Sequence, residues 1–447
     1  MGHAEFKLDD RLATRTISMD EYWMPFTPNR DFKHEPKMVV RAEDMFVWNE
    51  RGERLIDASS GLFCVNAGHC RREIADAVSA QLRELDFIAP FTRGHPKQFE
   101  LASRVAELTP GDLNRVFFVS SGSEAVDTAM KVALAYWQAK GQGGRTLFVS
   151  RERAYHGVNF GGTSLAGIAN NRRRCGAALP GVVHMRHTHL AENRFQPGEG
   201  AHGVELAEDL VRFVNLYGAE NIAACFVEPI AGSTGCLVPP RGYLRRLREI
   251  CDQHGILLVF DEVITGFGRT GRAFASESFQ VTPDIVTMAK GITNGAQPMG
   301  AVAVSERVHD AIVSAAPDGA IEFFHGYTYS GHPAACAAGL ATLDLYRDEG
   351  LFERGRSLSP YFLDALFSLR DIPVVADIRG YGMLGAIDVQ PDGAPGRRGH
   401  LLQKRLFDNG LHLKATGDAA LVAPPLIADR THVDAIVDIL RRTLESL

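Results

Sequence analysis

The chain has 447 residues, of which 45% are hydrophobic and 23% are charged, and its formal net charge is -6. This length is sufficient for two domains, or for one large domain with an appendage. The negative net charge disfavours a nucleic-acid-binding surface, which requires basic patches. No run of about 18 apolar residues is present, so we expect no membrane-spanning helix.

The cysteines indicate the compartment. Seven are scattered along the chain: Cys64, Cys70, Cys175, Cys225, Cys236, Cys251 and Cys336. None of them forms a Cys-x-x-Cys pair, which disfavours a zinc ribbon or a thioredoxin-like motif. Their odd number and the chain length favour reduced thiols over a disulfide framework. Because the N-terminus also lacks an apolar signal core, we expect a cytoplasmic protein.

Short apolar runs alternate with helical patterns between about residues 70 and 340. The runs are Val116–Val119, Thr146–Val149, Ile222–Val227, Ile256–Phe260, Ile285–Met288 and Gly300–Val304. The segments Ser123–Lys140 and Gly242–His254 have helical periodicity. This alternation predicts an α/β fold, with a mostly parallel sheet covered on both faces. After about residue 345, helical stretches flank short strands, which predicts a separate α+β domain.

Polar residues follow four of the apolar runs. They are Ser120–Ser123, Glu228–Pro229, Asp261–Glu262 and Ala289–Lys290. Ligands of open α/β sheets bind beyond the carboxyl ends of the strands. We therefore expect hydroxyls, carboxylates and one lysine to gather along a single edge of the sheet.

Lys290 and Asp261 suggest a specific cofactor. A lysine in an apolar setting has its charged form destabilised and can act as an amine nucleophile or Schiff-base former. A carboxylate at the same edge can keep a pyridinium nitrogen protonated. Alone, Lys290 is a typical solvated helix-start lysine, and Asp261 a metal ligand or helix cap. Their joint placement favours pyridoxal phosphate (PLP).

Ser121, Gly122 and Ser123 join a predicted strand to a predicted helix. Their N–H groups and hydroxyls suit a phosphate at a helix N-terminus. The alternative is a plain helix cap followed by an acidic first turn. No Gly-x-x-x-x-Gly-Lys-Ser/Thr motif is present, so a nucleotide P-loop is not supported.

Two further residues, Tyr155 and Glu228, lie after predicted strands. Tyr155, in Tyr155-His156-Gly157, has a ring that can stack on a flat cofactor, although one more aromatic in a loop is the simpler interpretation. Glu228 either reaches the site or caps the end of its strand. Neither residue would identify a function alone.

A histidine-rich segment superficially resembles a metal site. His184, His187 and His189 have a spacing that neither a helix nor a strand would bring together, and we expect no acidic partner nearby. We therefore expect no metal site.

Several motifs resemble class III aminotransferases of fold type I, in particular the ω-amino acid (or amine):pyruvate group that includes β-alanine:pyruvate transaminase. The resemblance covers nearly the whole chain. The matching segments are Tyr22–Pro25, Ser121–Glu124, Tyr155–Asn159, Val227–Pro229, Phe260–Arg269, Met288–Lys290 and His325–Ser330. The Asp261 segment, with Lys290 at this spacing, is the most specific of them.

The resemblance implies roles for the residues that handle the cofactor ring. Lys290 would carry PLP and, once displaced by substrate, move a proton between substrate and cofactor. Asp261 would keep the pyridine nitrogen protonated. Val263 and Tyr155 would sandwich the ring, and His156 and Glu228 would also contact the cofactor.

The resemblance also implies a shared site. Gly122 and Ser123, with Ser121, would hold the phosphate, joined by Thr328 from the second subunit of a homodimer, which is either complete or half of a tetramer. Residues 66–340 would form the large domain. Residues 1–65 and 341–447 would together form the smaller domain.

The substrate side departs from the family pattern. Many relatives have an arginine near the C-terminus that pairs with a substrate carboxylate, whereas Lys414 occupies the matching position here. Lysine is a point charge without the bidentate fork of arginine. Trp23, Phe63 and Phe87 are expected to line a pocket that accepts hydrophobic amines as well as short ω-amino acids.

The sequence thus predicts PLP-dependent transfer of an amino group from an ω-amino acid or primary amine to pyruvate, giving alanine. An aminomutase, racemase or decarboxylase on the same scaffold is the alternative. A catalytically silent scaffold protein is a further one, against which the intact Lys290, Asp261 and Tyr155 argue. No Gly-x-Gly-x-x-Gly follows a predicted strand, so a nicotinamide enzyme is disfavoured.

Overall fold

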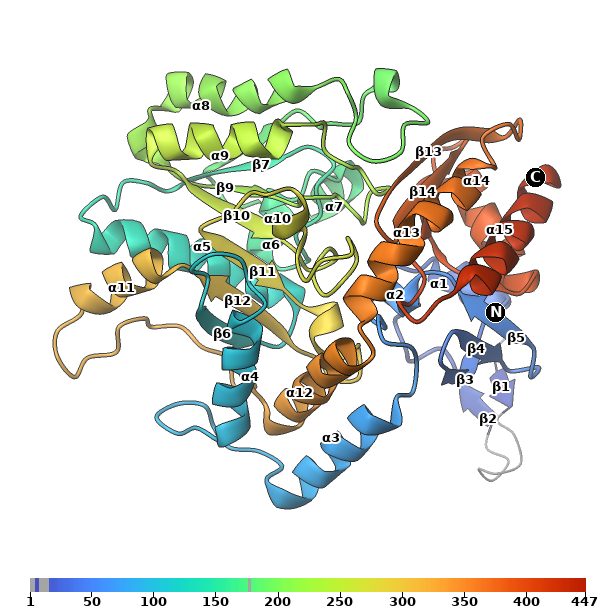
Figure 1. Ribbon diagram of the computed structural model, residues 1–447, viewed down its shortest axis with the longest axis horizontal. Helices are drawn as coiled ribbons and strands as arrows, with labels where there is room; N and C mark the ends of the chain where they lie inside the picture. Colours follow the sequence, from blue (N-terminus) through green and yellow to red (C-terminus); the bar gives the residue numbers. More distant parts are fainter. Residues whose placement is uncertain (1–4, 8–15, 176–177) are drawn as a thin grey trace.

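The structure is a computed structural model, and it describes residues 5–7, 16–175 and 178–447. The chain forms a large unit around a central sheet, with a smaller unit beside it that contains both ends of the chain (Figure 1). In the described part of the chain, no helix combines the length and the apolarity needed to cross a membrane.

Seven strands form the central sheet: β6 (Arg115–Val119), β7 (Leu147–Arg151), β8 (Val182–Met185), β9 (Ile222–Val227), β10 (Leu257–Asp261), β11 (Ile285–Met288) and β12 (Gly300–Val304). Their order is β6-β12-β11-β10-β9-β7-β8. β12 is antiparallel to both of its neighbours, whereas all the other pairs from β11 to β8 are parallel. The predicted mostly parallel sheet is confirmed.

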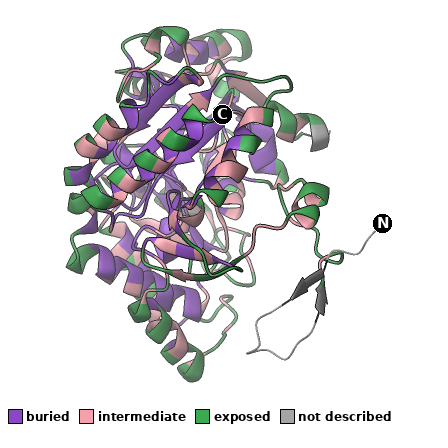
Figure 2. Cartoon of the chain, turned by 90° about the vertical axis from the view of Figure 1, so that its right-hand side faces the viewer, coloured by how far each residue is buried: buried purple, intermediate pink, exposed green. Residues whose placement is uncertain are grey.

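Successive residues of a central strand face opposite cores. Val259 packs in the core that includes α5 (Gly122–Ala139), and Phe260 packs in the core that includes α9 (Tyr243–His254) and α12 (Pro333–Asp348). Both faces of the strands are covered, so the continuous apolar runs of the sequence are buried throughout. Figure 2 shows this pattern, with buried strands inside and helices whose outer faces are exposed.

The remaining helices of the large unit surround the sheet and its edges. They are α3 (Arg72–Glu84), α4 (Pro96–Ala106), α6 (Phe160–Leu165), α7 (Ala169–Cys175), α8 (Asp209–Tyr217), α10 (Ala275–Ser278), α11 (Glu306–Ala315), η1 (Ala191–Asn193), η2 (Val204–Glu208), η3 (Ala219–Asn221) and η4 (Lys290–Thr293).

The smaller unit has two sheets. One contains β3 (Val39–Glu43), β4 (Phe46–Asn49), β5 (Arg54–Asp57) and β15 (Leu411–His412), and the other contains β13 (Val375–Tyr381), β14 (Leu384–Val389), β16 (Lys414–Thr416) and β17 (Ala419–Val422). β15 pairs with β5 in parallel, so the two ends of the chain share one sheet. This confirms the predicted smaller α+β domain built from the terminal segments.

The other elements of the terminal segments are mostly helical. They are α1 (Asn29–His34), α2 (Ser60–Phe63), α13 (Leu351–Phe367), α14 (Arg397–Asp408), α15 (Arg430–Glu445), and the antiparallel pair β1 (Glu5–Lys7) and β2 (Thr16–Ser18).

A buried arginine joins the two units. Arg269 Nε donates to Asn66 Oδ1 at 3.0 Å, while its two Nη atoms donate to Ser60 Oγ at 2.6 Å and to the Pro424 carbonyl at 2.6 Å. Among the described residues it has no carboxylate partner. Burial lowers the pKa of Arg269 to about 10, so the guanidinium still carries its charge at neutral pH.

Candidate active site

Lys290 lies just beyond β11, at the start of η4. Its φ of 51° is in the left-handed region, which costs energy for a residue with a Cβ atom and therefore needs support from its surroundings. The Tyr346 hydroxyl donates to the Gly291 carbonyl at 2.7 Å, and Asn294 Nδ2 donates to the Gly68 carbonyl at 2.8 Å. These bonds fix the loop that presents Lys290.

The side chain of Lys290 has no hydrogen-bond or ion-pair partner in the described part of the chain. Burial lowers the pKa of Lys290 below that of an ordinary lysine, while the neighbouring Cys64, Asp261 and Glu228 act in the opposite direction. A lowered pKa increases the share of the neutral amine, which is the nucleophilic form.

Asp261 is the last residue of β10, the strand next to β11. Its Oδ2 atom lies 2.8 Å from His156 Nδ1, and its Oδ1 atom accepts a hydrogen bond from the Val263 N–H at 3.1 Å. His156 Nε2 is buried and has no partner among the described residues. The carboxylate of Asp261 is thus held in one orientation by a buried imidazole.

Glu228 follows β9, the next strand along the sheet. Its Oε1 atom accepts a hydrogen bond from the Tyr155 N–H at 2.9 Å. Burial raises the pKa of Glu228 to about 7, and the nearby Asp261 adds to this effect. Burial also raises the pKa of the Tyr155 phenol. Near neutral pH, Glu228 therefore exists in both protonation states.

The N-terminus of α5 forms the opposite end of the site. Ser121 caps the helix, because its hydroxyl accepts a hydrogen bond from the Glu124 N–H at 3.2 Å. The N–H groups of Gly122 and Ser123, in the first turn, have no intrahelical acceptor. A Cβ atom on Gly122 would lie only 3.0 Å from a methyl group of Val263, so this position has no room for a larger residue.

These residues line one cavity of about 130 Å³. Its lining consists of Gly122, Ser123, Tyr155, His156, Gly157, Glu228, Asp261, Val263, Ile264, Ala289 and Lys290. Every residue predicted to contact the cofactor is present, apart from Ser121 and Thr328. Gly157, Ile264 and Ala289 were not predicted, although each is adjacent in sequence to a residue that was.

The sequence profile described as aminotransferase class-III matches residues 28–444. The chain belongs to this family. It is 52% identical over 428 residues to the ω-aminotransferase of Caulobacter vibrioides, which covers 95% of this chain and 97% of that one. It is also 46% identical over 434 residues to the β-alanine–pyruvate aminotransferase of Pseudomonas aeruginosa, with 96% and 97% covered.

A solved structure agrees with this assignment. The crystal structure of the ω-transaminase from Pseudomonas jessenii in complex with PMP has a TM-score of 0.90 and 32% identity, and 96% of each chain is covered. The predicted fold type and family of this class-III aminotransferase are therefore confirmed.

The cavity of this aminotransferase fits PLP, the cofactor of its family. An unpartnered amine, Lys290, is available for the aldehyde of PLP, and the oriented carboxylate of Asp261 is available for the pyridine nitrogen. The helix N-terminus at Gly122 and Ser123 offers N–H groups to a phosphate. The residues present thus match the three functional groups of the cofactor.

Lys414 begins β16, where it lies opposite Leu421 of β17. It is half-buried, and it has no hydrogen-bond or ion-pair partner in the described part of the chain. Burial lowers the pKa of Lys414, and the positive charge of Lys290 lowers it further. The two ammonium groups are thus close enough for their charges to interact.

The other residues predicted on the substrate side do not line the cavity within the same chain. Trp23 is 88% exposed, and Phe63 is buried in the core. Phe87 is exposed, with its ring 5.9 Å from that of Tyr329, and Thr328 is also exposed. The roles of these residues remain predictions.

Cys64 is a neighbour of Lys290 that the sequence did not reveal. Burial raises the pKa of its thiol, and the charges of Lys290 and Arg269 act in the opposite direction. A Cβ atom on Gly295 would lie 3.1 Å from Cys64 Cβ, which places the thiol against the lysine loop. The contact joins segments far apart in sequence, and no local pattern signals it.

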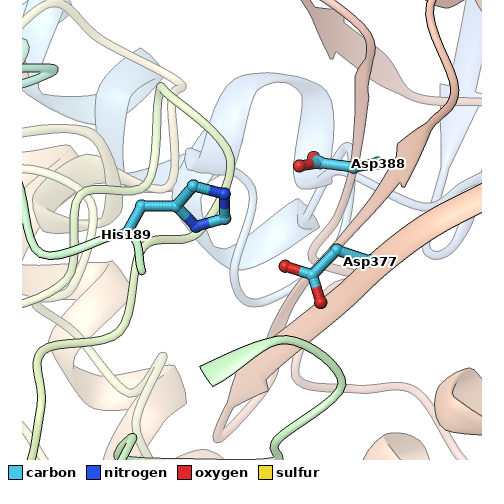
Figure 3. A group of neighbouring side chains, drawn as sticks. All are labelled: His189, Asp377 and Asp388. Carbon is cyan, nitrogen blue, oxygen red and sulfur yellow. The ribbon is translucent and has the colours of Figure 1, made fainter. Parts of the chain in front are cut away.

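His189 lies close to two acidic residues, contrary to the sequence-based reasoning that found none near it. Its ring faces Asp377 and Asp388 of the smaller unit (Figure 3), with ligand atoms within 4.8 Å of one another. However, Arg379 donates to Asp377 at 2.5 Å and to Asp388 at 2.7 Å. Burial, followed by the charges of Arg379 and Arg153, lowers the pKa of His189 to about 4. Arg379 pairs with both carboxylates within the smaller unit, and the neutral His189 of the large unit lies beside this ion-pair cluster.

Proposed function

We propose that this protein transfers the amino group of an ω-amino acid of the β-alanine type, or of a primary amine, to pyruvate, with PLP as cofactor and alanine as product. A single observation carries the proposal. In a class-III aminotransferase fold, Lys290 and Asp261 lie at the ends of two adjacent strands and line the same cavity. The names of the related ω-amino acid and β-alanine enzymes support the substrate class.

PLP supplies a cationic ring that withdraws electrons from the carbon bearing the amino group. Lys290 would hold the cofactor through its Nζ atom. When free of the cofactor, the neutral Nζ would accept a proton from the substrate carbon that bears the amino group and return it. The lowered pKa of Lys290 suits both tasks, because the neutral amine is the form that accepts the proton.

Asp261 keeps the proton on the pyridine nitrogen. His156 holds the carboxylate from behind at 2.8 Å, so no reorientation is needed when the ring charge develops. Val263 and Tyr155 bind the two faces of the ring, and Glu228 fixes Tyr155 through its backbone N–H. Together, these residues would hold the ring of the cofactor in one orientation beside Lys290.

The phosphate is bound at the N-terminus of α5 by Gly122 and Ser123, and by Thr328 from the second subunit of a homodimer. The exposed position of Thr328 outside its own cavity supports this arrangement. The dimer is either the complete assembly or half of a tetramer.

Exposed apolar side chains around Thr328 support the same dimer. Phe87 and Tyr329 are in edge-to-face contact at 5.9 Å, and both are exposed. Phe91 is also exposed, and its ring lies close to Gly326, two residues before Thr328, because a Cβ atom built on Gly326 would lie 2.8 Å from it. Contiguous apolar patches on a single chain mark interaction surfaces. A second copy of this chain is the occupant that would also complete the phosphate site.

Lys414 binds the carboxylate of an ω-amino acid donor and that of pyruvate. It is a half-buried cation that has no partner within the part of the chain that the structure describes, and its charge interacts with that of Lys290. The carboxylate of a bound substrate would pair with the Lys414 ammonium group and so compensate its positive charge. Trp23, Phe63 and Phe87 remain the proposed apolar walls for amine donors.

A panel of donors, each added to the PLP-loaded protein without an acceptor, tests the proposal. β-Alanine should bleach the yellow colour of the bound cofactor, and pyruvate should restore it with formation of alanine. Bleaching by an arylalkylamine alone would limit the protein to amines. Turnover of any donor without pyruvate would instead support the aminomutase, racemase or decarboxylase alternative, because only a transaminase consumes a stoichiometric keto acid.

A further inference from the structure

Thr328 lies at the tip of a tight turn. The Ser330 N–H donates to the Tyr327 carbonyl at 3.1 Å, and the Tyr327 N–H donates to Ser330 Oγ at 3.3 Å, which closes the turn on both sides. Thr328 and Tyr329, the central residues, are exposed. The turn is therefore rigid at its base and presents its tip away from its own chain.

His325 attaches this turn to α5. Its Nε2 atom lies 2.8 Å from Thr128 Oγ1, and Lys131 Nζ donates to its Nδ1 atom at 3.3 Å. Since an ammonium group can only donate, Nδ1 is the acceptor, so Nε2 carries the hydrogen and donates to Thr128. Burial, and then the charge of Lys131, lowers the pKa of His325 to about 4, which keeps this neutral form at neutral pH.

Aromatic rings hold the imidazole on three sides. It stacks on Phe117 of β6 with 5.5 Å between centroids and 10° between planes. Phe323 and Tyr327 meet it edge-on at 5.3 and 4.9 Å. These contacts hold the ring of His325 in place. Because the turn begins two residues later, they also restrain its position.

The same helix carries the phosphate-binding residues of its own subunit. Thr128 follows Gly122 in α5, and a helical rise of 1.5 Å per residue separates them by roughly 9 Å along the axis. Thr128 is fully buried, so the connection runs through packed structure. Helix α5 therefore links one phosphate site directly to the turn that would serve the other site.

We propose that His325 is a positioning residue that fixes Thr328 relative to α5, so that the Thr328 hydroxyl meets the cofactor phosphate of the second subunit. The inference rests on the proposed shared-site homodimer and extends it. Its consequence is spatial: removing His325 from one chain should weaken cofactor binding in the partner's site and leave its own site unchanged.

Mixed dimers, made from two differently tagged chains, separate these outcomes. Lys290→Ala silences one site, so only the other site develops the absorbance that PLP gains on joining Lys290. In the first arrangement, His325→Ala is on the silenced chain, whose Thr328 serves the live site. In the second arrangement, His325→Ala is on the live chain. We expect PLP affinity to fall roughly fivefold to tenfold in the first arrangement and to remain unchanged in the second.

Companion variants show that the hydrogen bond, rather than general packing, is responsible. Thr128→Val removes the hydroxyl that accepts from His325, together with its contact to the Tyr327 side chain, and should reproduce the effect in the first arrangement. This variant keeps the test valid if His325→Ala fails to dimerise. His325→Gln retains a donor and should recover part of the affinity. His309→Ala, on α11 and ion-paired with its neighbour Asp310, is the matched control and should change nothing.

Thr328→Ala, placed in the same two arrangements, is the benchmark. It should weaken binding only in the first arrangement, and His325→Ala should add little to it on the same chain, because both would remove one contact. If Thr328→Ala acts across subunits and His325→Ala acts in neither arrangement, the inference is overturned and the shared site stands. If Thr328→Ala weakens only its own chain's site, the shared site itself is disproved, and the inference with it.

Discussion

In the cofactor cavity, Lys290, Asp261 and Glu228 follow three adjacent strands of one sheet, and a single chain supplies their surroundings. On the substrate side, Trp23 and Phe87 are exposed, and Lys414 is a cation without a partner among the described residues. One chain thus supplies the residues around the cofactor ring, and in our proposal a second copy adds only Thr328 to the phosphate site. The substrate side, in contrast, depends on a ligand to pair with Lys414. The cofactor chemistry is fixed by the sheet, and the substrate specificity is determined at its periphery.

Lys290→Ala tests the cofactor side most severely. Because Lys290 is the only amine lining the cavity in the described structure, turnover with β-alanine and pyruvate should fall by at least about 10³-fold. PLP content, measured after denaturation, should remain measurable through the phosphate contacts. Lys140→Ala, at the exposed C-terminal end of α5, is the control. Retained turnover would remove the central role of Lys290.

Asp261→Asn should lower kcat by about 10²–10³-fold, because a neutral amide cannot hold the proton on the pyridine nitrogen as an oriented carboxylate does. Steady-state kinetics and the visible spectrum of the bound cofactor would measure the effect. Asp252→Asn, in an exposed ion pair on α9, should leave both unchanged. An unchanged kcat in the Asp261 variant would argue that another group protonates the ring.

Glu228→Gln should change the pH dependence of stability in the cofactor-free protein. Burial raises the pKa of Glu228 from 4.5 to about 7, so the buried group must lose its proton against this cost as the pH rises. The wild-type protein therefore loses up to about 3 kcal/mol of stability between pH 4.5 and 7, relative to the glutamine variant. Urea unfolding at pH 5 and pH 8 would measure this. Parallel profiles for the two proteins would show that Glu228 does not titrate in this range.

Lys414→Met addresses the substrate side and should have the smallest effect. KM for β-alanine should rise about tenfold or more, while an arylalkylamine donor should be unaffected, because only the former loses a charged contact. Burial lowers the pKa of Lys414, so the wild-type KM for β-alanine should rise as the pH passes through that lowered value. Lys414→Arg should shift this rise to higher pH.

Lys404→Met is the matched control for Lys414, because Lys404 is ion-paired with Glu35 away from the cavity. Equal losses for β-alanine and for the arylalkylamine in the Lys414 variant would mean that Lys414 shapes the pocket without reading a carboxylate. In that case the substrate side would select its donors by shape and apolar contacts, without an electrostatic contribution from Lys414.

The sequence was informative where local pattern determines structure. The run Ile222–Val227 forms a strand with those bounds because both of its faces are buried. The residues directly after three of the predicted runs, Glu228, Asp261 and Ala289, line the cavity. The antiparallel direction of β12 was not predictable, since an apolar run does not reveal its orientation. β8 was not predicted, because the polar His184 interrupts the apolar run in Val182–Met185.

Contacts between distant segments were the main omission. Cys64 lies against the Lys290 loop, and Asp377 and Asp388 lie beside His189, although nothing in the sequence around these residues indicates a partner. Such neighbours are set by the packing of the two units against each other. A single sequence contains no local signal for that packing.

The buried guanidinium of Arg269 limits how the two units can move. It binds Ser60 and Asn66 in one segment and the Pro424 carbonyl in another, so separating these segments would leave a charge without partners in an apolar interior. Leaving a buried charge without its partners costs roughly 3–5 kcal/mol. We therefore expect substrates to enter through rearrangement of side chains and loops at the rim, while the frame that carries Lys290 remains stationary throughout the catalytic cycle.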